Sequence, residues 1–232
     1  MTDYHSHILP GIDDGSKNIE ESIKLLAMLR EQGVDISVAT PHFYADRTTP
    51  GEFLSKRQAA YESLVLYPEF PGADIRLGAE VSYFPGISRI SALRDLRIEG
   101  TKLLLLEMPF TKWSEYTLRE ISELSCSGDV VLMLAHMERY LEFQSRGTAE
   151  ELAQMGILIQ CNASFFANKA TSRKAFRMLK KGLINAVGSD CHSVDARPPR
   201  FDEFRAALTE KFGPRFLDGF IDENDSLLEV FV

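Results

Sequence analysis

Residues 130–136 read Val-Val-Leu-Met-Leu-Ala-His, an uninterrupted apolar run that ends in a histidine. A run without polar alternation is typical of a strand that is buried on both faces, as in a parallel sheet covered by helices. Comparable short runs occur at Met1–Tyr4, Ile36–Ala39, Ile75–Ala79, Lys102–Leu106, Gly156–Cys161 and Asn185–Gly188. Together with the run at Val130–Ala135, they predict seven parallel strands.

Amphipathic helical segments separate these runs. Asn18 can cap the first, with Glu21 as its capping-box partner, and Gly33 can end it. Further helices are expected to begin near Ser114 and Pro198-Pro199 and to end near Gly182 and Gly213. Alternation of strand and helix over 232 residues predicts an α/β fold, either a barrel or a doubly wound sheet. Seven strands in place of eight favour an irregular or incomplete barrel.

The composition indicates a single domain over residues 1–232, because no linker, repeat or change in composition divides the chain. The formal net charge of −8 disfavours nucleic acid and anionic membranes as partners, since they need a basic surface. No apolar segment approaches the roughly 20 residues that span a bilayer, and the N-terminus lacks a signal-peptide pattern. Three cysteines without a CxxC motif indicate reduced thiols. We therefore expect a cytoplasmic protein without membrane insertion, with Cys126 and Cys161 in its core.

All five histidines follow the end of a predicted strand closely, by one to four residues. They are His5, His7, His42, His136 and His192. Three acidic residues, Glu80, Glu107 and Asp190, occupy the same kind of position. Because the carboxyl ends of parallel strands meet at one face of an α/β fold, we expect these side chains to converge. Imidazole and carboxylate ligands together suit Zn, Mn or Fe, so the pattern predicts a metal centre.

Two short spacings support this prediction. In His5-x-His7 both side chains would point to the same side of an extended segment, and we expect Asp190-x-His192 to repeat that geometry. The loop Asp13-Asp14-Gly15 adds two carboxylates near the first pair, although Asp-Gly also favours an ordinary turn. A single histidine after a strand is more often a surface or hydrogen-bonding residue. The conjunction of five histidines with several acids favours the metal centre.

Two arginines and four aromatic residues lie close to these candidates. Arg139 and Arg197 match the oxygens of a phosphate group, although a surface salt bridge explains either arginine alone about as well. Four aromatic residues also follow strand ends: Phe110, Trp113, Phe165 and Phe166. Core packing is their default role, and the wall of a partly exposed pocket is the alternative.

The stretch from Cys191 to Arg197 matches C-x5-R, the spacing of cysteine-dependent tyrosine phosphatases. That chemistry needs a thiolate with a lowered pKa and a ring of backbone N–H groups around the phosphate. Here the loop has no glycine and contains Asp195, and Asp190 precedes it. Negative charge on both sides opposes a thiolate, so we interpret the match as accidental.

The motifs that contain these residues resemble those of a known superfamily. They are His5-Ser-His7-Ile-Leu-Pro-Gly-Ile-Asp-Asp14-Gly, Ala-Thr40-Pro-His42, Gly78-Ala-Glu80, Leu-Glu107, Ala-His136-Met-Glu-Arg139-Tyr and Ser189-Asp190-Cys-His192 with Arg197-Pro-Pro. Over about residues 1–200 the chain is similar to the PHP (polymerase and histidinol phosphatase) superfamily. Within it, the chain resembles the bacterial manganese-dependent protein-tyrosine phosphatases of capsule and exopolysaccharide clusters, the CpsB/YwqE type.

The resemblance implies a distorted (β/α)7 TIM-like barrel with up to three divalent ions, Mn2+ first, with Fe, Zn, Co or Mg as alternatives. The implied ligand sets are His5, His7, Glu80 and Asp190; Glu80, Glu107 and His136; and Asp14, His42 and His192. Glu80 would bridge the first two ions, and Arg139 and Arg197 would contact the phosphate. The chain departs from the family at Met137, where proline is usual, and at Cys191, where a small residue is usual. Cys191 would make the site sensitive to oxidation.

The implied substrate is a phosphotyrosine protein, namely the C-terminal tail of a membrane tyrosine autokinase. We expect hydroxide activated between two metal ions to attack phosphorus in line, without a covalent enzyme intermediate. Two alternatives stay open: a phosphatase of a small metabolite such as histidinol phosphate, and a non-catalytic metal-binding regulatory protein. The oligomeric state is open too. Apolar residues after Gly213 are expected to cover the barrel or to form a subunit contact: Phe216, Leu217, Phe220, Leu227 and Leu228.

Overall fold

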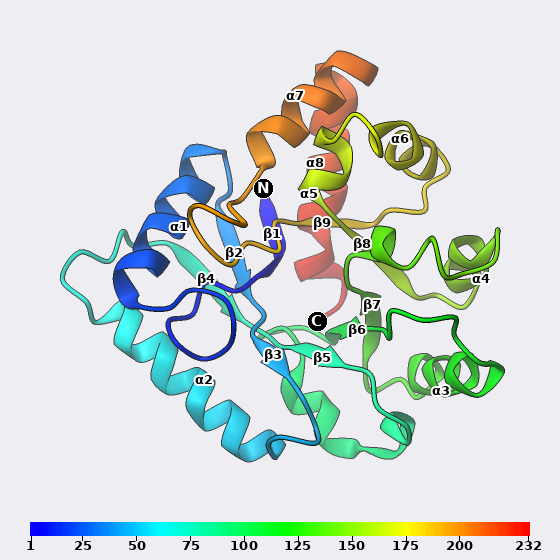
Figure 1. The fold of residues 1–232 in the computed structure, drawn as a ribbon, viewed down its shortest axis with the longest axis horizontal. Coiled ribbons are helices and arrows are strands. Elements are labelled where there is room, and N and C mark those ends of the chain that lie inside the picture. Colours follow the sequence, from blue (N-terminus) through cyan, green and yellow to red (C-terminus); the bar gives the residue numbers. More distant parts are fainter.

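A curled parallel sheet forms the centre of the molecule, and helices surround it (Figure 1). The structure is a computed structural model that describes residues 1–232. Its strands are β1 (Thr2–Ser6), β2 (Ile36–Ala39), β3 (His42–Phe43), β4 (Asp74–Leu77), β5 (Glu80–Ser82), β6 (Leu103–Glu107), β7 (Val131–Leu134), β8 (Leu158–Asn162) and β9 (Ala186–Gly188). Every strand pairing is parallel, in the orders β1-β2-β4 and β3-β5-β6-β7-β8-β9.

Two of the seven predicted strands are each followed by a second short strand that continues them. β3 continues β2 after Thr40-Pro41, and β5 continues β4 after Gly78-Ala79. Pairing continues across the break, because the N–H of Gly78 donates to the carbonyl of Ala39 (2.8 Å) and that of Glu80 to the carbonyl of Pro41 (3.1 Å). Counting each broken pair once, the nine strands make the seven that the sequence predicted.

The first and last strands meet and close the ring. The N–H of Asp190 donates to the carbonyl of His5 (2.7 Å), and the N–H of His7 donates to the carbonyl of Cys191 (3.0 Å). This contact requires a glycine, since a Cβ atom at Gly188 would lie 2.5 Å from the Cβ of His5. The predicted α/β class and the distorted barrel of seven parallel strands are therefore confirmed.

The helices are α1 (Ile19–Glu31), α2 (Pro50–Val65), α3 (Glu115–Cys126), α4 (Thr148–Gln154), α5 (Ala163–Ala167), α6 (Ser172–Lys180), α7 (Phe201–Phe212) and α8 (Pro214–Val230). Three short 3₁₀ turns, η1 (Ile87–Arg89), η2 (Ser91–Leu96) and η3 (Met137–Arg139), complete the structure. Asn18 caps α1 as predicted, but the side chain of Glu21 accepts from the N–H of Lys17, so the expected capping box does not form. Ser114 caps α3. The proline pair precedes α7, which begins only at Phe201.

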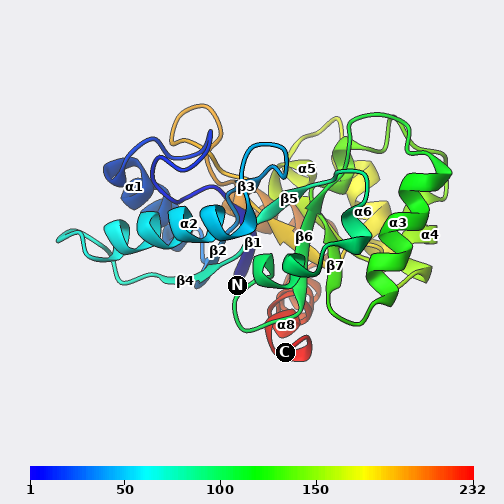
Figure 2. The same cartoon turned by 90° about the horizontal axis from the view of Figure 1, so that it is seen from below.

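Helix α8 closes the end of the barrel that lies away from the loops after β1 and β9 (Figure 2). Its Asn224 accepts from the N–H of Val187 (3.0 Å) and donates to the carbonyl of Thr2 (3.0 Å), which ties β9 and β1 to the helix. Leu217 and Phe220 are buried. The prediction that the residues after Gly213 cover the barrel is confirmed, although Phe216 stays exposed.

The interior of the barrel changes from apolar to polar towards the carboxyl ends of the strands. On β6, Leu103 and Leu105 belong to the inner apolar cluster, and Glu107 is the next residue on the same face. On β8, Leu158 packs against this cluster, and Gln160 follows on the same face. The polar layer lies where the candidate ligands gather. The cysteine prediction is half right, because Cys161 is buried whereas Cys126, the last residue of α3, is exposed.

Candidate metal centre

Glu80, the first residue of β5, lies at the centre of the histidine cluster and is almost completely buried. Its Oε2 is 3.2 Å from Nε2 of His5, 3.2 Å from Nε2 of His7 and 3.0 Å from Nδ1 of His42. Its Oε1 is 2.9 Å from Nε2 of His136. One carboxylate therefore contacts imidazoles from three different parts of the barrel.

Two further acids lie beside this group. Oδ1 of Asp190 is 3.7 Å from Nε2 of His5 and 3.6 Å from Nε2 of His7. Oε1 of Glu107, at the end of β6, is 3.6 Å from Nε2 of His136. Both carboxylates thus lie close enough to the imidazoles that Glu80 contacts for a single metal ion to bind an oxygen and a nitrogen together.

Asp14 marks the more open side of the cluster. Its Oδ1 is 3.4 Å from Nε2 of His42 and 3.5 Å from Nε2 of His192. The ring of His192 also packs 3.9 Å, centroid to centroid, from the ring of His7. The loop after β1 and the loop after β9 therefore meet around these three imidazoles.

Nine side chains offer donor atoms that lie close enough together to hold metal ions. The groups are His7, Asp14, His42 and His192; His5, His7 and Asp190; His5, Glu80 and His136; and His42, Glu80 and Glu107. These nine residues are the nine that the sequence pointed to, and the structure brings all of them together. These groups do not coincide with the expected ligand sets, and the assignment of ligands to individual ions stays a prediction.

The donor atoms fit cations. Nε2 of His192 and Nδ1 of His42 are buried, and neither is aligned for a hydrogen bond with the carboxylate oxygen beside it. Burial alone would lower the pKa of His7, yet its contacts with Asp13 and Glu80 raise that pKa to about 10. Burial together with the nearby His7 and Arg197 lowers the pKa of His192 to about 4. Buried polar atoms without partners are costly, and divalent ions would satisfy them.

The two ligand pairs separated by one residue, His5-x-His7 and Asp190-x-His192, differ in backbone conformation. The Nε2 atoms of His5 and His7 are 3.1 Å apart, so their side chains point to the same side as predicted. The side chains of Asp190 and His192 also lie together, with Oδ1 of Asp190 3.6 Å from Nδ1 of His192, but Asp190 has a φ of +51°, so the predicted extended backbone is wrong. His136 also has a positive φ, +29°. Such conformations are costly outside glycine and cluster at functional sites, and here they turn two side chains towards the cluster.

Three outer residues hold candidate ligands in place, two of them imidazoles and one a carboxylate. Oδ2 of Asp13 lies 2.7 Å from Nδ1 of His7, and Oε1 of Gln160 lies 3.3 Å from Nδ1 of His5. The side-chain amide of Asn162 donates to Oδ2 of Asp190 (2.9 Å). Sequence reasoning missed the roles of Gln160 and Asn162. Their spacing of two on an otherwise apolar strand was the signal that could have identified them.

The two arginines converge on Asp190. Nη2 of Arg197 is 2.6 Å from its Oδ2, and Nη2 of Arg139 contacts the same oxygen. The side chains of Arg139 and Arg197 are 36% and 39% exposed, so part of each guanidinium faces solvent. The alternative of an ordinary surface salt bridge is wrong, because the shared partner is a buried carboxylate of the cluster.

The four aromatic candidates separate into core and surface residues. Trp113 and Phe166 are buried, and Phe165 is buried beside a pocket. Phe110 is 44% exposed, and its ring lies nearly parallel to that of His136, with the centroids 5.9 Å apart and an angle of 18°. The pocket-wall alternative therefore holds for Phe165, whereas Phe110 is an exposed ring at the edge of the cluster.

Cys191 cannot act as a nucleophile in this conformation. Its side chain is fully buried, and burial, with Asp3 nearby, raises the pKa of the thiol far above its ordinary value. A buried neutral thiol is a poor nucleophile and is protected from oxidants. The C-x5-R match is accidental, and the expected sensitivity to oxidation finds no support.

Residues 1–229 match the family model "Capsular polysaccharide synthesis, CpsB/CapC". The chain belongs to the CpsB/CapC family. It is 32% identical to the tyrosine-protein phosphatase CpsB of Streptococcus pneumoniae over 245 residues, covering 93% of this chain and 92% of the relative. It is 28% identical to the tyrosine-protein phosphatase CpsB of Streptococcus agalactiae, over 99% of this chain and 98% of the relative.

The architecture is also that of CpsB/CapC proteins. The chain superposes with a TM-score of 0.86 and 25% identity on a structure from the work on YwqE from Bacillus subtilis and CpsB from Streptococcus pneumoniae. The match covers 100% of this chain and 96% of the other, and those two proteins are described as metal-dependent tyrosine phosphatases. None of the helices is long and apolar enough to cross a membrane.

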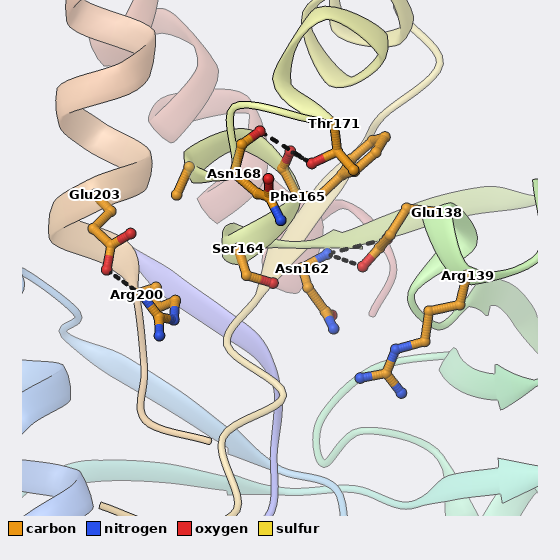
Figure 3. A pocket seen from close by; sticks show the side chains of 10 residues that line it. Glu138, Arg139, Asn162, Ser164, Phe165, Asn168, Thr171, Arg200 and Glu203 are labelled. Carbon is orange, nitrogen blue, oxygen red and sulfur yellow. Dashed lines mark hydrogen bonds and ion pairs between the residues drawn. The ribbon is translucent and has the colours of Figure 1, made fainter. Parts of the chain in front are cut away.

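A polar pocket of about 520 Å³ adjoins the cluster in this member of the CpsB/CapC family (Figure 3). Arg139 and Asn162, which both contact Asp190, form its inner side. Ser164 and Arg200 lie further out. The pocket therefore begins at the cluster and extends towards α7.

Proposed function

We propose that this chain is a metal-dependent protein-tyrosine phosphatase. The observation that supports this most directly is the arrangement around Glu80, whose two oxygens contact four imidazoles, with two half-exposed arginines on the adjacent Asp190. Buried histidine and carboxylate ligands can hold metal ions, and the neighbouring guanidinium groups can bind the oxygens of a phosphoryl group placed against those ions. The tyrosine phosphatases among its relatives provide the substrate class.

We assign the nine converging residues as ligands for up to three divalent ions, with Mn2+ as the first choice. Glu80 is placed to bridge two of them, because its two oxygens face different imidazoles. Ions bound there would lower the pKa of water so that hydroxide is available at neutral pH, and would offset charge on the phosphoryl oxygens.

The chain's own groups position the substrate. Arg139 and Arg197 would bind the phosphoryl oxygens with the N–H groups that Asp190 leaves free, which fixes phosphorus for in-line attack. Asp13 and Gln160 keep the Nε2 atoms of His7 and His5 directed at the cluster. The ring of Phe110 offers a partly exposed surface on which the aryl group of phosphotyrosine can pack.

No general acid is needed for this substrate. The leaving group of a phosphotyrosine is a phenolate with a pKa near about 10, so it departs far more easily than an alkoxide. We assign no residue to this role. Serine and threonine phosphates lack this advantage, which makes aryl esters the favoured substrate class.

We further propose that the partner is the tyrosine-rich C-terminal tail of a membrane tyrosine autokinase that regulates capsule or exopolysaccharide synthesis. The family description supports the link to capsule synthesis, and the names of the relatives support a phosphotyrosine protein as substrate, whereas the kinase tail is implied by the resemblance in the sequence. The cytoplasmic location, the single domain and the oligomeric state stay predictions or open points.

The test is turnover by metal-depleted protein to which Mn2+ is returned, on a phosphotyrosine peptide, a phosphoserine peptide and histidinol phosphate. We expect hydrolysis only with metal present, and much faster on phosphotyrosine. Preference for histidinol phosphate would indicate the small-metabolite phosphatase. Metal bound according to elemental analysis without turnover of any ester would indicate the regulatory protein.

A further inference from the structure

The polar pocket beside the cluster has two guanidinium groups at its opposite ends. Arg139 is at the inner end, where it also contacts Asp190, and Arg200 is at the outer end (Figure 3). Asn162 and Ser164 lie between the two arginines in this view. A substrate whose phosphate lies at Arg139 would therefore pass its neighbouring residues along this pocket.

Arg200 already binds a carboxylate. Its Nη1 is 2.6 Å from Oε1 of Glu203, one turn along the same segment. Both side chains are nearly half exposed, at 46% and 47%. Pairs of this kind at a spacing of three residues contribute little, so an incoming carboxylate can take the place of Glu203 at small cost.

The negative net charge of the protein makes a local basic site such as Arg200 important for binding an acidic peptide. A chain with a formal net charge of −8 repels an acidic peptide unless a local basic site attracts it. The other acid in the pocket, Glu138, is half-buried and accepts from the backbone N–H of Asn162 (3.2 Å), so its carboxylate already has a hydrogen-bond partner beside Arg139.

We propose that this pocket is a second anion-binding subsite, in which Arg200 binds the carboxylate of an acidic residue close to the phosphotyrosine of the substrate protein. The proposal rests on the proposed phosphatase function and adds a sequence preference to it. Glu203 acts as a competitor for Arg200, which keeps the guanidinium oriented in the absence of substrate and weakens the subsite when substrate binds.

The experiment measures kcat/KM for a series of neutral phosphotyrosine peptides in which one glutamate is moved through the flanking positions, each with a matched glutamine peptide. In the wild-type protein we expect at least one position where glutamate is preferred by about two- to fivefold. Arg200→Ala should bring that ratio to about one, and Glu203→Gln should raise it above the wild-type value.

Two controls separate this subsite from catalysis. Arg177→Ala removes an exposed arginine of α6 outside the pocket and should leave the glutamate preference unchanged. Turnover of p-nitrophenyl phosphate, which has no flanking residues, should be the same in the wild type and in the Arg200 and Glu203 variants. Equal turnover also shows that these variants are folded.

The outcomes are distinct. If the wild type hydrolyses phosphotyrosine peptides without a glutamate preference at any position, the subsite is overturned and the phosphatase function stands. A preference that survives in Arg200→Ala, or loss of p-nitrophenyl phosphate turnover in that variant, also overturns it. If the metal-loaded wild type hydrolyses neither substrate, the phosphatase function fails, and the subsite fails with it.

Discussion

Oδ2 of Asp13 lies 2.7 Å from Nδ1 of His7 and also accepts the backbone N–H of His42 at 3.0 Å. One carboxylate outside the ligand set therefore fixes the ring orientation of one ligand and the backbone position of another. Burial opposes the charged form of Asp13, but His7 and the backbone N–H groups of Gly15 and His42 lower its pKa to about 2, so it stays ionised.

We expect Asp13→Asn to weaken metal binding by about 10- to 100-fold, because His7 loses the acceptor that directs its Nε2 at the cluster. Metal titration of the purified apoprotein measures the change. Asp46→Asn, which alters an exposed aspartate of the neighbouring loop, is the matched control and should bind metal like the wild type. Unchanged affinity in the Asp13 variant would contradict its orienting role.

Arg139→Lys and Arg197→Lys should each lower kcat/KM for a phosphotyrosine peptide by about 10- to 100-fold. Lysine keeps the charge but lacks the planar set of donors that can serve Asp190 and a phosphoryl oxygen together. Elemental analysis should find the metal content unchanged. Activity near that of the wild type in both variants would remove these residues from phosphate binding.

Phe110→Leu should reduce the preference for phosphotyrosine over an alkyl phosphate by about two- to tenfold, since a flat ring is lost beside His136. The ratio of kcat/KM for the two ester classes is the measurement. Phe110→Trp keeps an aromatic surface and should preserve most of the ratio. An equal loss on both esters would point to a disturbed His136 in place of a lost aryl contact.

Metal-free protein should lose stability at alkaline pH. Carboxylates raise the pKa of His7 to about 10 and that of His136 to about 9, despite burial, from an ordinary value of 6.5. The stabilisation from these charged imidazoles is fully present below about pH 6.5 and is lost as pH rises through 9 to 10. Thermal unfolding of chelator-treated protein between pH 6 and 10 measures this loss.

The same protons compete with metal, because a ligand imidazole must be neutral. Affinity for Mn2+ should therefore rise over the interval in which the stability of the metal-free protein falls. The His136→Gln variant should show a flatter stability profile. A metal-free protein that becomes more stable towards pH 10 would contradict the assigned charge state.

The ligands were predictable because each lies near a recognisable strand end. Ile36–Ala39 is reproduced residue for residue as β2, and His136 directly follows the apolar run of β7 after Ala135. Histidines and acids at the carboxyl ends of parallel strands can be recognised as candidate ligands from the sequence alone, because those strand ends meet at one face of the fold.

Other features depend on contacts that no local pattern encodes. The breaks at Thr40-Pro41 and Gly78-Ala79 arise where two neighbouring strands bend together, and the side chains of Thr40 and Val38 occupy the space beside Gly78. The positive φ of Asp190 follows from its N–H bonding to the carbonyl of His5, a residue far away in sequence. The exposure of Cys126 depends on where α3 ends on the surface.

Gly188 and His5 touch at the seam where the ring closes, and the ligands on either side of that seam come from opposite ends of the chain. During synthesis, His5 and His7 therefore cannot contact Asp190 and His192 until most of the chain has been made. A nascent or truncated chain that stops short of this point lacks Asp190 and His192, two of the nine candidate ligands. Such a chain would be inert, so catalytic competence appears only late in synthesis.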